Sequence, residues 1–563
     1  MPISRASKLC RFRRFALTLL AIAALVAYTQ AQTPDQHPGN SISGTVVNSV
    51  THEPIGRALV YTMDNRYATF TDDHGHFEVS LPEQTPVPTA RAMSVRAILL
   101  VKKPGYLSDA GPRGGTEVAS EQSDVTLTLI PEALIVGQVK FPSAEAADRV
   151  RVQLYRREVG GGFAHWEPVQ QVGTRADGEY RFAELRAGEY KVFTLESTER
   201  DPLTAIPNGP VFGFPPRYFA GARDFASADT IQLHAGETIA AEIAPERLRY
   251  YNVRIPVMIP QPADSGIAVS VHAQGHRGPG FALGYDQNQH AIRGSLPNGT
   301  YAVEASGYGP AAATGMTTIT VANGPVNAPL LTLAANVSIE VNVRQDLPAG
   351  ENPQGAQNVY VALQSAEEFS VESGSGGNYQ AQGNPPVLGG VSPGRYWVQI
   401  NPNASGMYFG SVTSGTKDLL RTPLVVPYGA SVPPIEITVR YDGAEIDATL
   451  DGKPFQYASV GVSGTVGSVG RRGRFGAATG PSVYCIPVGN EGSPAREFYS
   501  LPDGSFALQQ IAPGDYRILA FDSPVELEYR NPAAMRAYES KGQVVHLTAG
   551  QKLQVQLQPI KSE

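Results

Sequence analysis

One five-residue segment of the sequence has the spacing of a nucleophilic site. Residues 390–394 read Gly-Val-Ser-Pro-Gly, and Gly-x-Ser-x-Gly presents a reactive serine in one class of hydrolases. That arrangement needs a strand-to-helix turn, whereas here a second strand-like segment, residues 397–400, follows at once. We therefore interpret Ser392 as a turn residue, and we predict no catalytic residue in the chain.

A second cluster could bind a metal ion. Asp72, Asp73, His74 and His76 offer the oxygen and imidazole ligands that metal sites use. A tight turn explains the same residues, and the corresponding positions elsewhere in the chain lack the histidines. We therefore predict no metal site and no cofactor.

Two aromatic loops are candidates for ligand binding. Residues 160–166 read Gly-Gly-Gly-Phe-Ala-His-Trp, and residues 212–219 read Phe-Gly-Phe-Pro-Pro-Arg-Tyr-Phe. Exposed rings can stack on sugars, and prolines hold them in place at little entropic cost. The alternative is that these rings cover the ends of a domain or a neighbouring domain. The candidate ligand-binding residues are Phe163, Trp166, Phe214 and Tyr218.

A recurring turn motif indicates the β-strands that must position these side chains. An Asp-Gly-x-aromatic turn precedes a Gly-x-Tyr turn twice, once over residues 177–190 and once over residues 503–516, with the two glycines ten residues apart each time. Glycine permits the positive φ of a tight hairpin turn, and an aromatic two residues later can point into a core. The predicted turn and core residues are Gly75, Phe77, Gly105, Tyr106, Asp177, Gly178, Tyr180, Gly188, Tyr190, Asp503, Gly504, Phe506, Gly514 and Tyr516.

Composition favours a β-rich chain with several domains. Of 563 residues, 58 are Gly and 45 are Pro, which leaves little room for long helices. The length exceeds one sandwich of about 100 residues and suits about five in series. The junctions lack long Ser/Gly tracts, which predicts a semi-rigid rod.

The N-terminus has the features of a secretory signal peptide. Basic residues precede an apolar run over residues 15–27, which is shorter than the roughly 20 residues that span a bilayer. Thr29 and Ala31 fit a cleavage site before Gln32, and an uncleaved anchor is the alternative. Cleavage after residue 31 leaves an acidic chain, which makes binding to nucleic acid unfavourable. We predict export to the periplasm, the outer cell surface or the medium, with no transmembrane segment after cleavage.

Cysteine use is sparse. Cys10 lies in the signal segment, so Cys485 alone remains after cleavage and no internal disulfide can form. We interpret Cys485 as a buried structural thiol, with a reactive thiol as the alternative.

The first domain resembles a known family. Gly44-Thr45-Val46, a Pro-x-x-x-Ala-x-Val motif over residues 54–60, an Asp-x-x-Gly-x-Phe motif over residues 72–77 and the ending Lys103-Pro104-Gly105-Tyr106 resemble the carboxypeptidase regulatory-like domain. The last domain repeats part of this pattern. The resemblance implies a transthyretin-like β-sandwich of the carbohydrate-binding-like fold group, which serves as an accessory module and carries no chemistry of its own.

The predicted fold class is all-β: a tandem array of about five Ig-like or transthyretin-like antiparallel β-sandwiches after a signal peptide. The boundaries are a signal peptide at 1–31, regulatory-like sandwiches at 41–131 and 442–563, a sandwich at 132–246, and divergent sandwiches at 247–333 and 334–441.

Two functions fit this architecture. We expect a non-catalytic exported scaffold, adhesion or binding protein whose partner is a polysaccharide or a cell-envelope protein. The alternative is an accessory subunit of a peptidase, or a hydrolase with its site in a divergent middle domain. The oligomeric state stays open at this point.

Overall fold

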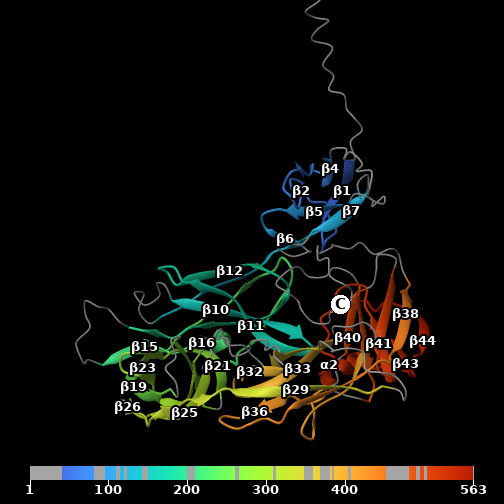
Figure 1. Cartoon of the computed structure of the whole chain (residues 1–563). Helices are drawn as coiled ribbons and strands as arrows, with labels where there is room; N and C mark the ends of the chain where they lie inside the picture. The colour runs from blue at the N-terminus through green and yellow to red at the C-terminus, as the bar shows by residue number, and fades with distance from the viewer. Residues whose placement is uncertain are drawn as a thin grey trace, which may run out of the picture. The chain divides into compact units, whose positions relative to one another are not determined.

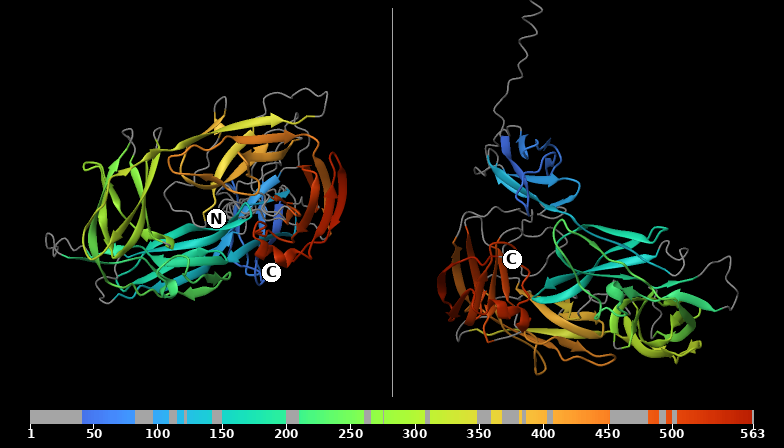
Figure 2. Two further views of the ribbon diagram at one scale, coloured as in Figure 1. Left: turned by 90° about the horizontal axis from the view of Figure 1, so that it is seen from below. Right: turned by 180° about the vertical axis from the view of Figure 1, so that it is seen from behind.

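The computed structural model consists almost wholly of short β-strands, as Figure 1 and Figure 2 show. The signal segment, Cys10 and Asp503 lie outside the described residues. The structure describes residues 41–81, 96–108, 115–119, 123–141, 150–199, 210–259, 266–274, 276–307, 312–347, 359–367, 381–382, 386–402, 407–451, 481–489, 495–499 and 504–561.

The chain divides into two compact units. The first holds Met1–Val47, Glu53–Val101 and Glu117–Leu127, and the second holds Asn48–His52, Lys102–Thr116 and Thr128–Glu563. The second unit therefore contains the last four expected sandwiches, together with three short segments of the first one.

The first sandwich has two four-stranded sheets, with strand orders β4-β1-β8-β6 and β3-β2-β5-β7. Its first strand alternates buried and half-buried side chains over residues 41–46, as expected for a strand with one face on a core. Its strands are β1 (Ser41–Asn48), β2 (Leu59–Thr62), β3 (Ala68–Phe70), β4 (His76–Ser80), β5 (Arg96–Lys102), β6 (Tyr106–Ser108), β7 (Thr116–Ala119) and β8 (Val125–Pro131).

The second sandwich pairs a three-stranded sheet, β12-β9-β18, with a sheet of order β11-β10-β13-β16 in which β17 also pairs with β13. Its core includes Ile135, Leu154, Phe182 and Val192. Its elements are β9 (Ala133–Gln138), β10 (Arg151–Gly160), β11 (Phe163–Gly173), β12 (Glu179–Leu185), β13 (Gly188–Thr194), β14 (Ser197–Thr198), β15 (Val211–Phe214), β16 (Arg217–Tyr218), η2 (Phe219–Gly221), β17 (Ile231–Leu233) and β18 (Thr238–Ala240).

The third sandwich borrows a strand pair from the second one. Strands β14 and β15 extend its first sheet in the order β14-β15-β19-β23-β22, and its second sheet has the order β21-β20-β24-β25-β28. The core includes Ile255, Ile292 and Val303. Its strands are β19 (Leu248–Met258), β20 (Ile267–Ala273), β21 (His276–Phe281), β22 (Gly284–Asp286), β23 (Ala291–Pro297), β24 (Gly299–Gly307), β25 (Ala313–Val321), β26 (Val326–Asn327), β27 (Leu331–Thr332) and β28 (Ala334–Ala335).

The fourth sandwich consists of a six-stranded sheet, β31-β32-β29-β37-β34-β35, and a three-stranded sheet, β30-β33-β36. Ile339, Leu363, Leu388 and Ile437 lie in its core. Its strands are β29 (Val337–Gln345), β30 (Val359–Ser365), β31 (Ala381–Gln382), β32 (Val387–Val391), β33 (Gly394–Pro402), β34 (Tyr408–Ser414), β35 (Lys417–Asp418), β36 (Leu424–Val426) and β37 (Ile435–Arg440).

The fifth sandwich has the sheets β41-β38-β44 and β40-β39-β42-β43. Its core includes Ile446, Val483, Leu508 and Ile518. Its elements are β38 (Ala444–Leu450), β39 (Ser482–Pro487), β40 (Arg496–Tyr499), β41 (Ser505–Ile511), β42 (Gly514–Ala520), α2 (Pro532–Met535), η3 (Arg536–Tyr538), β43 (Gln543–Leu547) and β44 (Lys552–Leu557).

The predicted all-β tandem array is confirmed, with one feature that the sequence did not indicate. The opening strand of each of the last four sandwiches pairs in parallel with a closing strand, as β9 does with β18, β19 with β26 and β27, β29 with β37, and β38 with β44. The rest of each sandwich forms the long connection that a parallel pair requires.

The expected domain boundaries lie in the connections between named strands. The 131/132 boundary falls between β8 and β9, the 246/247 boundary between β18 and β19, and the 441/442 boundary between β37 and β38. The 333/334 boundary precedes β28, which pairs with β25 of the third sandwich. The boundaries themselves stay predictions.

Candidate functional site

The Gly-x-Tyr turns place one tyrosine in the same way in four sandwiches. Each hydroxyl donates a hydrogen bond to the backbone carbonyl four residues earlier: Tyr190 to Arg186 (2.7 Å), Tyr301 to Pro297 (2.9 Å), Tyr396 to Ser392 (2.9 Å) and Tyr516 to Ala512 (2.8 Å). All four rings are buried. The ring packs into the core while the hydroxyl fixes the turn, so these tyrosines are structural in this arrangement.

In the third and fourth sandwiches, the glycine two residues earlier leaves room for that ring. A Cβ at Gly299 would lie 2.9 Å from the hydroxyl oxygen of Tyr301, and one at Gly394 would lie 3.1 Å from that of Tyr396. Gly188 and Gly514 have the same backbone, with φ of 154° and 150°. In the third and fourth sandwiches the spacing thus reflects a tyrosine ring that packs back over its own turn.

The Asp-Gly turns also have the backbone that the sequence predicts. Gly178 and Gly504 have φ of 82° and 80°. The carboxylate of Asp177 accepts a hydrogen bond from the Glu179 amide (3.0 Å), and the Tyr180 hydroxyl donates to the Ala241 carbonyl. These contacts tie the turn to the end of the same sandwich. The aromatic after the second turn, Phe506, is buried in the core of the fifth sandwich.

The first sandwich uses its acidic turn in the same way. The Asp72 carboxylate accepts hydrogen bonds from the amides of His74 and His76, both at 2.8 Å, and the bond from His76 is the main reason that its pKa is lowered. Gly75 has a φ of 77°, and Phe77 is buried. His76 shares a 3.0 Å hydrogen bond with Thr45. Among the described residues, no three acidic, histidine or cysteine side chains are grouped as metal ligands.

The other predicted turn of the first sandwich lies at Gly105 and Tyr106. Gly105 has a φ of 83°, and its carbonyl accepts a hydrogen bond from the Glu132 amide (3.0 Å). Tyr106 is half-buried, and the ammonium of Lys103 lies 5.7 Å from the centre of its ring.

Ser392 sits in a polar junction between the third and fourth sandwiches. Its hydroxyl accepts a hydrogen bond from the Asn336 side chain (3.1 Å), which also donates to the Gly390 carbonyl (3.3 Å). The side-chain amide oxygen of Asn336 accepts a hydrogen bond from the Thr314 hydroxyl (2.8 Å), and the Asn336 backbone amide donates one to the Ala312 carbonyl (2.9 Å). Ser392 is buried between β32 and β33, so a strand follows the turn where a nucleophile would need a helix.

Cys485 lies on β39 in the core of the fifth sandwich. It is 1% exposed and is a free thiol. Burial raises its pKa to about 12, which keeps it protonated at neutral pH. This environment is that of a structural thiol.

One ring from each aromatic loop enters the same small core, which agrees with the alternative that these rings cover part of the fold. Trp166 and Tyr218 are 5% and 2% exposed, and both contact Phe225, with ring centres 5.7 Å and 6.0 Å away. The Lys191 ammonium lies 5.1 Å from the Trp166 ring. The rings are buried because they form a second apolar layer on β10, β11 and β13 that the alternation of those strands did not reveal.

Phe214 is also buried. It packs edge-on against Phe141 with ring centres 4.5 Å apart, and it belongs to β15, the strand that the third sandwich shares. The hydroxyl of nearby Tyr218 donates to Pro279 of the third sandwich (2.7 Å). The second aromatic loop therefore helps to join two sandwiches.

Phe163, at the tip of the β10–β11 hairpin, reaches the fourth and fifth sandwiches. It stacks on Trp397 of β33 with ring centres 4.3 Å apart and an interplanar angle of 19°. The Arg530 guanidinium lies 4.9 Å from the Phe163 ring and 4.6 Å from the Trp397 ring. We call Phe163, Trp397 and Arg530 the aromatic clasp. It brings together three sandwiches, which the semi-rigid rod did not predict.

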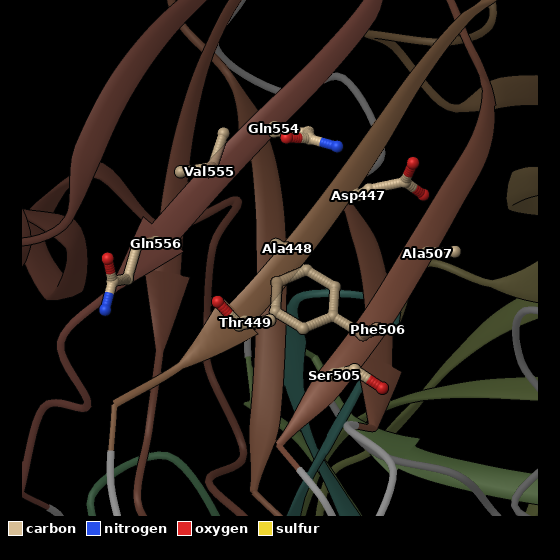
Figure 3. A pocket seen from close by; sticks show the side chains of 9 residues that line it. All are labelled: Asp447, Ala448, Thr449, Ser505, Phe506, Ala507, Gln554, Val555 and Gln556. Atoms are coloured by element: carbon tan, nitrogen blue, oxygen red, sulfur yellow. The ribbon is translucent and has the colours of Figure 1, made fainter.

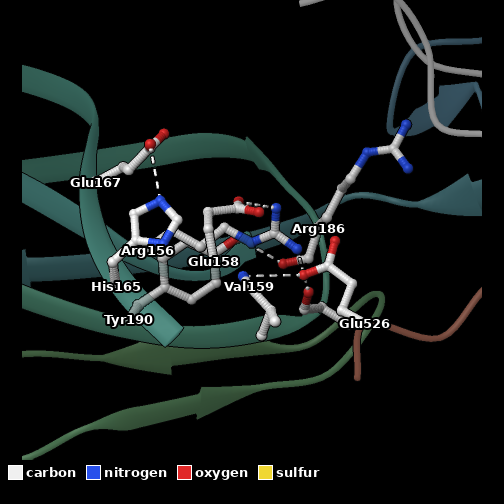
Figure 4. Close-up of polar contacts among 9 residues, drawn as sticks. Arg156, Glu158, Val159, His165, Glu167, Arg186, Tyr190 and Glu526 are labelled. Atoms are coloured by element: carbon white, nitrogen blue, oxygen red, sulfur yellow. Dashed lines mark hydrogen bonds and ion pairs between the residues drawn. The ribbon is translucent and has the colours of Figure 1, made fainter. Parts of the chain in front are cut away.

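Polar contacts surround the clasp, and Figure 4 shows part of them. The Arg157 guanidinium lies 2.5 Å from the Glu528 carboxylate, and the Val159 amide donates to Glu526 (3.4 Å). The Arg530 amide donates to the carbonyl of Gly162 (3.2 Å). These contacts link the hairpin of the second sandwich to the loop before α2 in the fifth.

The same hairpin carries its own ion pairs. Arg156 lies 2.5 Å from Glu158 and donates to the Ala187 carbonyl (3.2 Å), while His165 lies 3.0 Å from Glu167 (Figure 4). The hydrogen bond to Glu167 raises the pKa of His165. The first pair lies along β10 and the second along β11, the two strands of the hairpin that presents Phe163.

Replacing Trp397 by alanine is expected to open the clasp. The loss of one stacked pair and one cation–π contact weakens this junction by about 1–2 kcal/mol. Hydrogen exchange should become faster at residues 158–163 and 526–531 and stay unchanged in the core of the third sandwich. The control is Tyr428→Ala, which removes a ring that is 43% exposed in the fourth sandwich, the one that also holds Trp397. Unchanged exchange at both segments in Trp397→Ala would show that the clasp does not hold the junction.

A separate hollow of about 640 Å³ lies on the sheet β41-β38-β44 (Figure 3). Three consecutive residues from each strand line it, and most are polar or small. No aromatic platform is among its exposed side chains, since Phe506 is buried in the core. The lining residues are Asp447, Ala448, Thr449, Ser505, Phe506, Ala507, Gln554, Val555 and Gln556.

One buried acid stands at the junction of the second and third sandwiches. The Glu196 carboxylate accepts a hydrogen bond from the Ala282 amide (3.0 Å), and the Glu196 amide donates to Gly280 (3.1 Å). Burial raises the pKa of Glu196 to about 7, although the hydrogen bond from the Ala282 amide opposes the shift. This carboxyl group therefore titrates near neutral pH.

Sequence reasoning missed Trp397, Arg530, Asn336 and Glu196. Trp397 and Asn336 read as ordinary residues in or beside strands, and each of the four has a partner in another sandwich. No local pattern identifies such contacts.

Comparisons with known proteins found no matching protein family and no match among curated proteins. The Bacillus anthracis TIE protein aligns at 11% identity over 68% of this chain and 66% of its own length, with a TM-score of 0.14. This chain thus spans just under two thirds of that protein. None of the helices in the described part of the chain is long and apolar enough to cross a membrane.

Two pilins align with similar scores. A streptococcal ancillary pilin is 12% identical over 55% of this chain and 99% of its own, with a TM-score of 0.16. The minor pilin GBS52 of Streptococcus agalactiae is 14% identical over 40% of this chain and 99% of its own, also with a TM-score of 0.16. TM-scores of this size mean that the whole chains do not superpose, so the functions of these proteins are not transferred to this chain.

Proposed function

We propose that this chain is an exported, non-catalytic scaffold or adhesion protein whose partner is a polysaccharide or a protein of the cell envelope. The observation that carries the proposal is the structural use of its reactive groups. Asp72 caps a turn, Ser392 accepts a hydrogen bond from Asn336, and Cys485 is buried with a raised pKa. Asp72 and Ser392 are engaged in contacts within the fold, and Cys485 is buried away from solvent.

The modular cores support the same proposal. The last four sandwiches each have a separate hydrophobic core, and hydrogen bonds and ring contacts join them. Such a chain holds surfaces at fixed spacing, which is what a scaffold needs. We further propose that the first and last sandwiches are related to the carboxypeptidase regulatory-like domain, on the sequence motifs described above. Export rests on the signal-like segment at the N-terminus.

The test is to incubate the chain from Gln32 with the envelope fraction and with a polysaccharide array, and to assay hydrolysis of peptide and ester substrates in parallel. We expect retention of an envelope component or a glycan and no turnover. Ser392→Ala tests the serine of the fourth sandwich as a nucleophile, and Asp72→Asn tests the acidic turn of the first sandwich as a metal ligand. Turnover by the chain would replace the proposal by the hydrolase, and its loss in Ser392→Ala would place the site in a divergent middle domain. Co-purification of a peptidase whose activity rises with added chain would favour the accessory subunit.

A further inference from the structure

The closing strands of the sandwiches differ in what covers their outer edge. In the first sandwich β8 pairs on its outer side with β6, and in the fourth β37 pairs with β34, both antiparallel. These closing strands have seven and six residues. Among the described residues, the closing strands β18, β26 and β27 of the second and third sandwiches have no outer partner either, but they have only two or three residues. Strand β44 has six residues and also ends its sheet among the described residues, with order β41-β38-β44. Figure 1 shows it at the rim of the fifth sandwich, beyond β38.

The chain segment that supplies the cover in the first and fourth sandwiches is used differently in the fifth sandwich. Strand β34 follows β33, the strand that begins with the Gly-x-Tyr turn of the fourth sandwich. In the fifth sandwich the corresponding strand is β42, and the residues after it form α2 and η3. Tyr529, Met535 and Tyr538 of this region pack with Tyr484 and Phe521, which lie on the other sheet or directly after it. The local sequence therefore leaves β44 without the added strand.

The outer edge of β44 presents backbone groups ready for pairing. The Glu445 amide donates to the Gln551 carbonyl (2.7 Å), and the Asp451 amide donates to the Leu557 carbonyl (2.9 Å). Odd-numbered residues of β44 thus direct their backbone groups toward β38. By the alternation of a strand, the N–H and C=O groups of Lys552, Gln554 and Gln556 point outward.

The side chains of this edge do little to prevent association. Edge strands are usually protected by charge, proline or a bulge. The sequence Lys-Leu-Gln-Val-Gln-Leu has one charged residue, and Lys552 is paired with Glu445 at 2.8 Å. Val555 and Leu557 face the core, while Gln554 and Gln556 are exposed. The edge is neutral over its central residues.

We propose that β44 pairs antiparallel with β44 of a second copy of this chain, centred on Val555. Both strands that cover a closing strand within the chain are antiparallel to it, and a two-fold axis brings two copies of β44 together in that orientation. The strand that pairs with β44 is therefore β44 of the second copy, in which inward and outward backbone groups alternate in the same way. The two three-stranded sheets join into one.

This register follows from the direction of the backbone groups. Centring on Val555 places Gln554 opposite Gln556 of the second copy, and the outward N–H and C=O groups of both face each other. Leu553 then lies opposite Leu557 of the second copy on the core side. A shift by one residue would oppose inward and outward groups and lose these bonds. Edge pairing buries little area compared with a standard interface, so the association is weak and depends on concentration.

Sedimentation velocity of the chain from Gln32, up to high micromolar concentration, tests the pairing. We expect a concentration-dependent dimer for the wild type. Gln554→Pro removes an outward N–H at an edge position that tolerates proline, and it should sediment as a monomer. Gln554→Thr keeps the N–H and should still dimerise. A wild type that stays monomeric, or Gln554→Pro that dimerises like the wild type, would overturn the proposal.

A charge pair then tests the register and the identity of the occupant. Gln554→Lys with Gln556→Lys places lysine opposite lysine and should abolish the dimer. Gln554→Lys with Gln556→Glu places opposite charges across the axis and should restore it. Equal behaviour of the two double variants would exclude this register between two copies. Unchanged hydrogen exchange in β38 shows that each variant retains the fold.

Discussion

Replacing Tyr190 by alanine is expected to destabilise the second sandwich by about 3–5 kcal/mol, the usual loss for a large buried aromatic side chain. The ring is 1% exposed in the core, and its hydroxyl holds the turn through Arg186 at 2.7 Å. Tyr190→Phe keeps the ring and should cost only about 1 kcal/mol, the net value of a typical hydrogen bond.

The measurement is hydrogen exchange of the full chain during mild denaturation, because a chain of several domains has no single unfolding transition. Residues 133–194 should open at lower denaturant in Tyr190→Ala, while residues 444–450 keep their protection. If Tyr190→Ala and Tyr190→Phe open alike, the ring contributes little and the Gly-x-Tyr turn is not a core feature.

The second large effect concerns pH. Glu196 has a pKa raised by burial to about 7, above the ordinary value of 4.5. The folded junction therefore binds a proton more tightly than the unfolded chain, so stability declines as pH rises from about 4.5 to about 7 and then levels off. A shift of this size corresponds to about 3 kcal/mol.

Glu196→Gln keeps the shape and the acceptor for the Ala282 amide but cannot ionise. The variant should be more stable than the wild type at pH 8 by up to about 3 kcal/mol and equal to it near pH 4. Denaturant melts followed by hydrogen exchange at residues 196–199 and 280–283, at both pH values, give the difference. The contributions of other titrating groups cancel in this difference because both proteins contain them. A difference that does not depend on pH would show that Glu196 titrates normally.

The sequence predicted the repeated unit because its signal is local. Glycine turns and alternating strands report on residues that are close along the chain, so Gly178, Gly188 and Gly504 could be assigned to turns from the sequence alone. The burial of Tyr190 and Tyr516 agrees with that prediction. The hydroxyl bond to the residue four positions earlier was not foreseen, although its partner is equally local.

Contacts between sandwiches could not be predicted in this way. The sequence left two interpretations of Phe163 open, an exposed ring for sugar stacking or a ring that covers a neighbouring domain, and it gave no sign that the partner is Trp397, in a sandwich far along the chain. Trp166 and Tyr218 looked like candidates for sugar stacking, and they are buried around Phe225. An aromatic side chain can either stack on a sugar at the surface or pack in a core, and the sequence near it does not distinguish the two.

The parallel pairing of opening and closing strands determines how the last four sandwiches respond to mechanical force. Tension along the chain pulls the start of β38 and the end of β44 in opposite directions along the strand axis. The ladder between them is then loaded in shear, so its hydrogen bonds resist together instead of separating one after another. Forced unfolding is governed by the unfolding rate, and this geometry keeps that rate low when the chain is stretched from its ends.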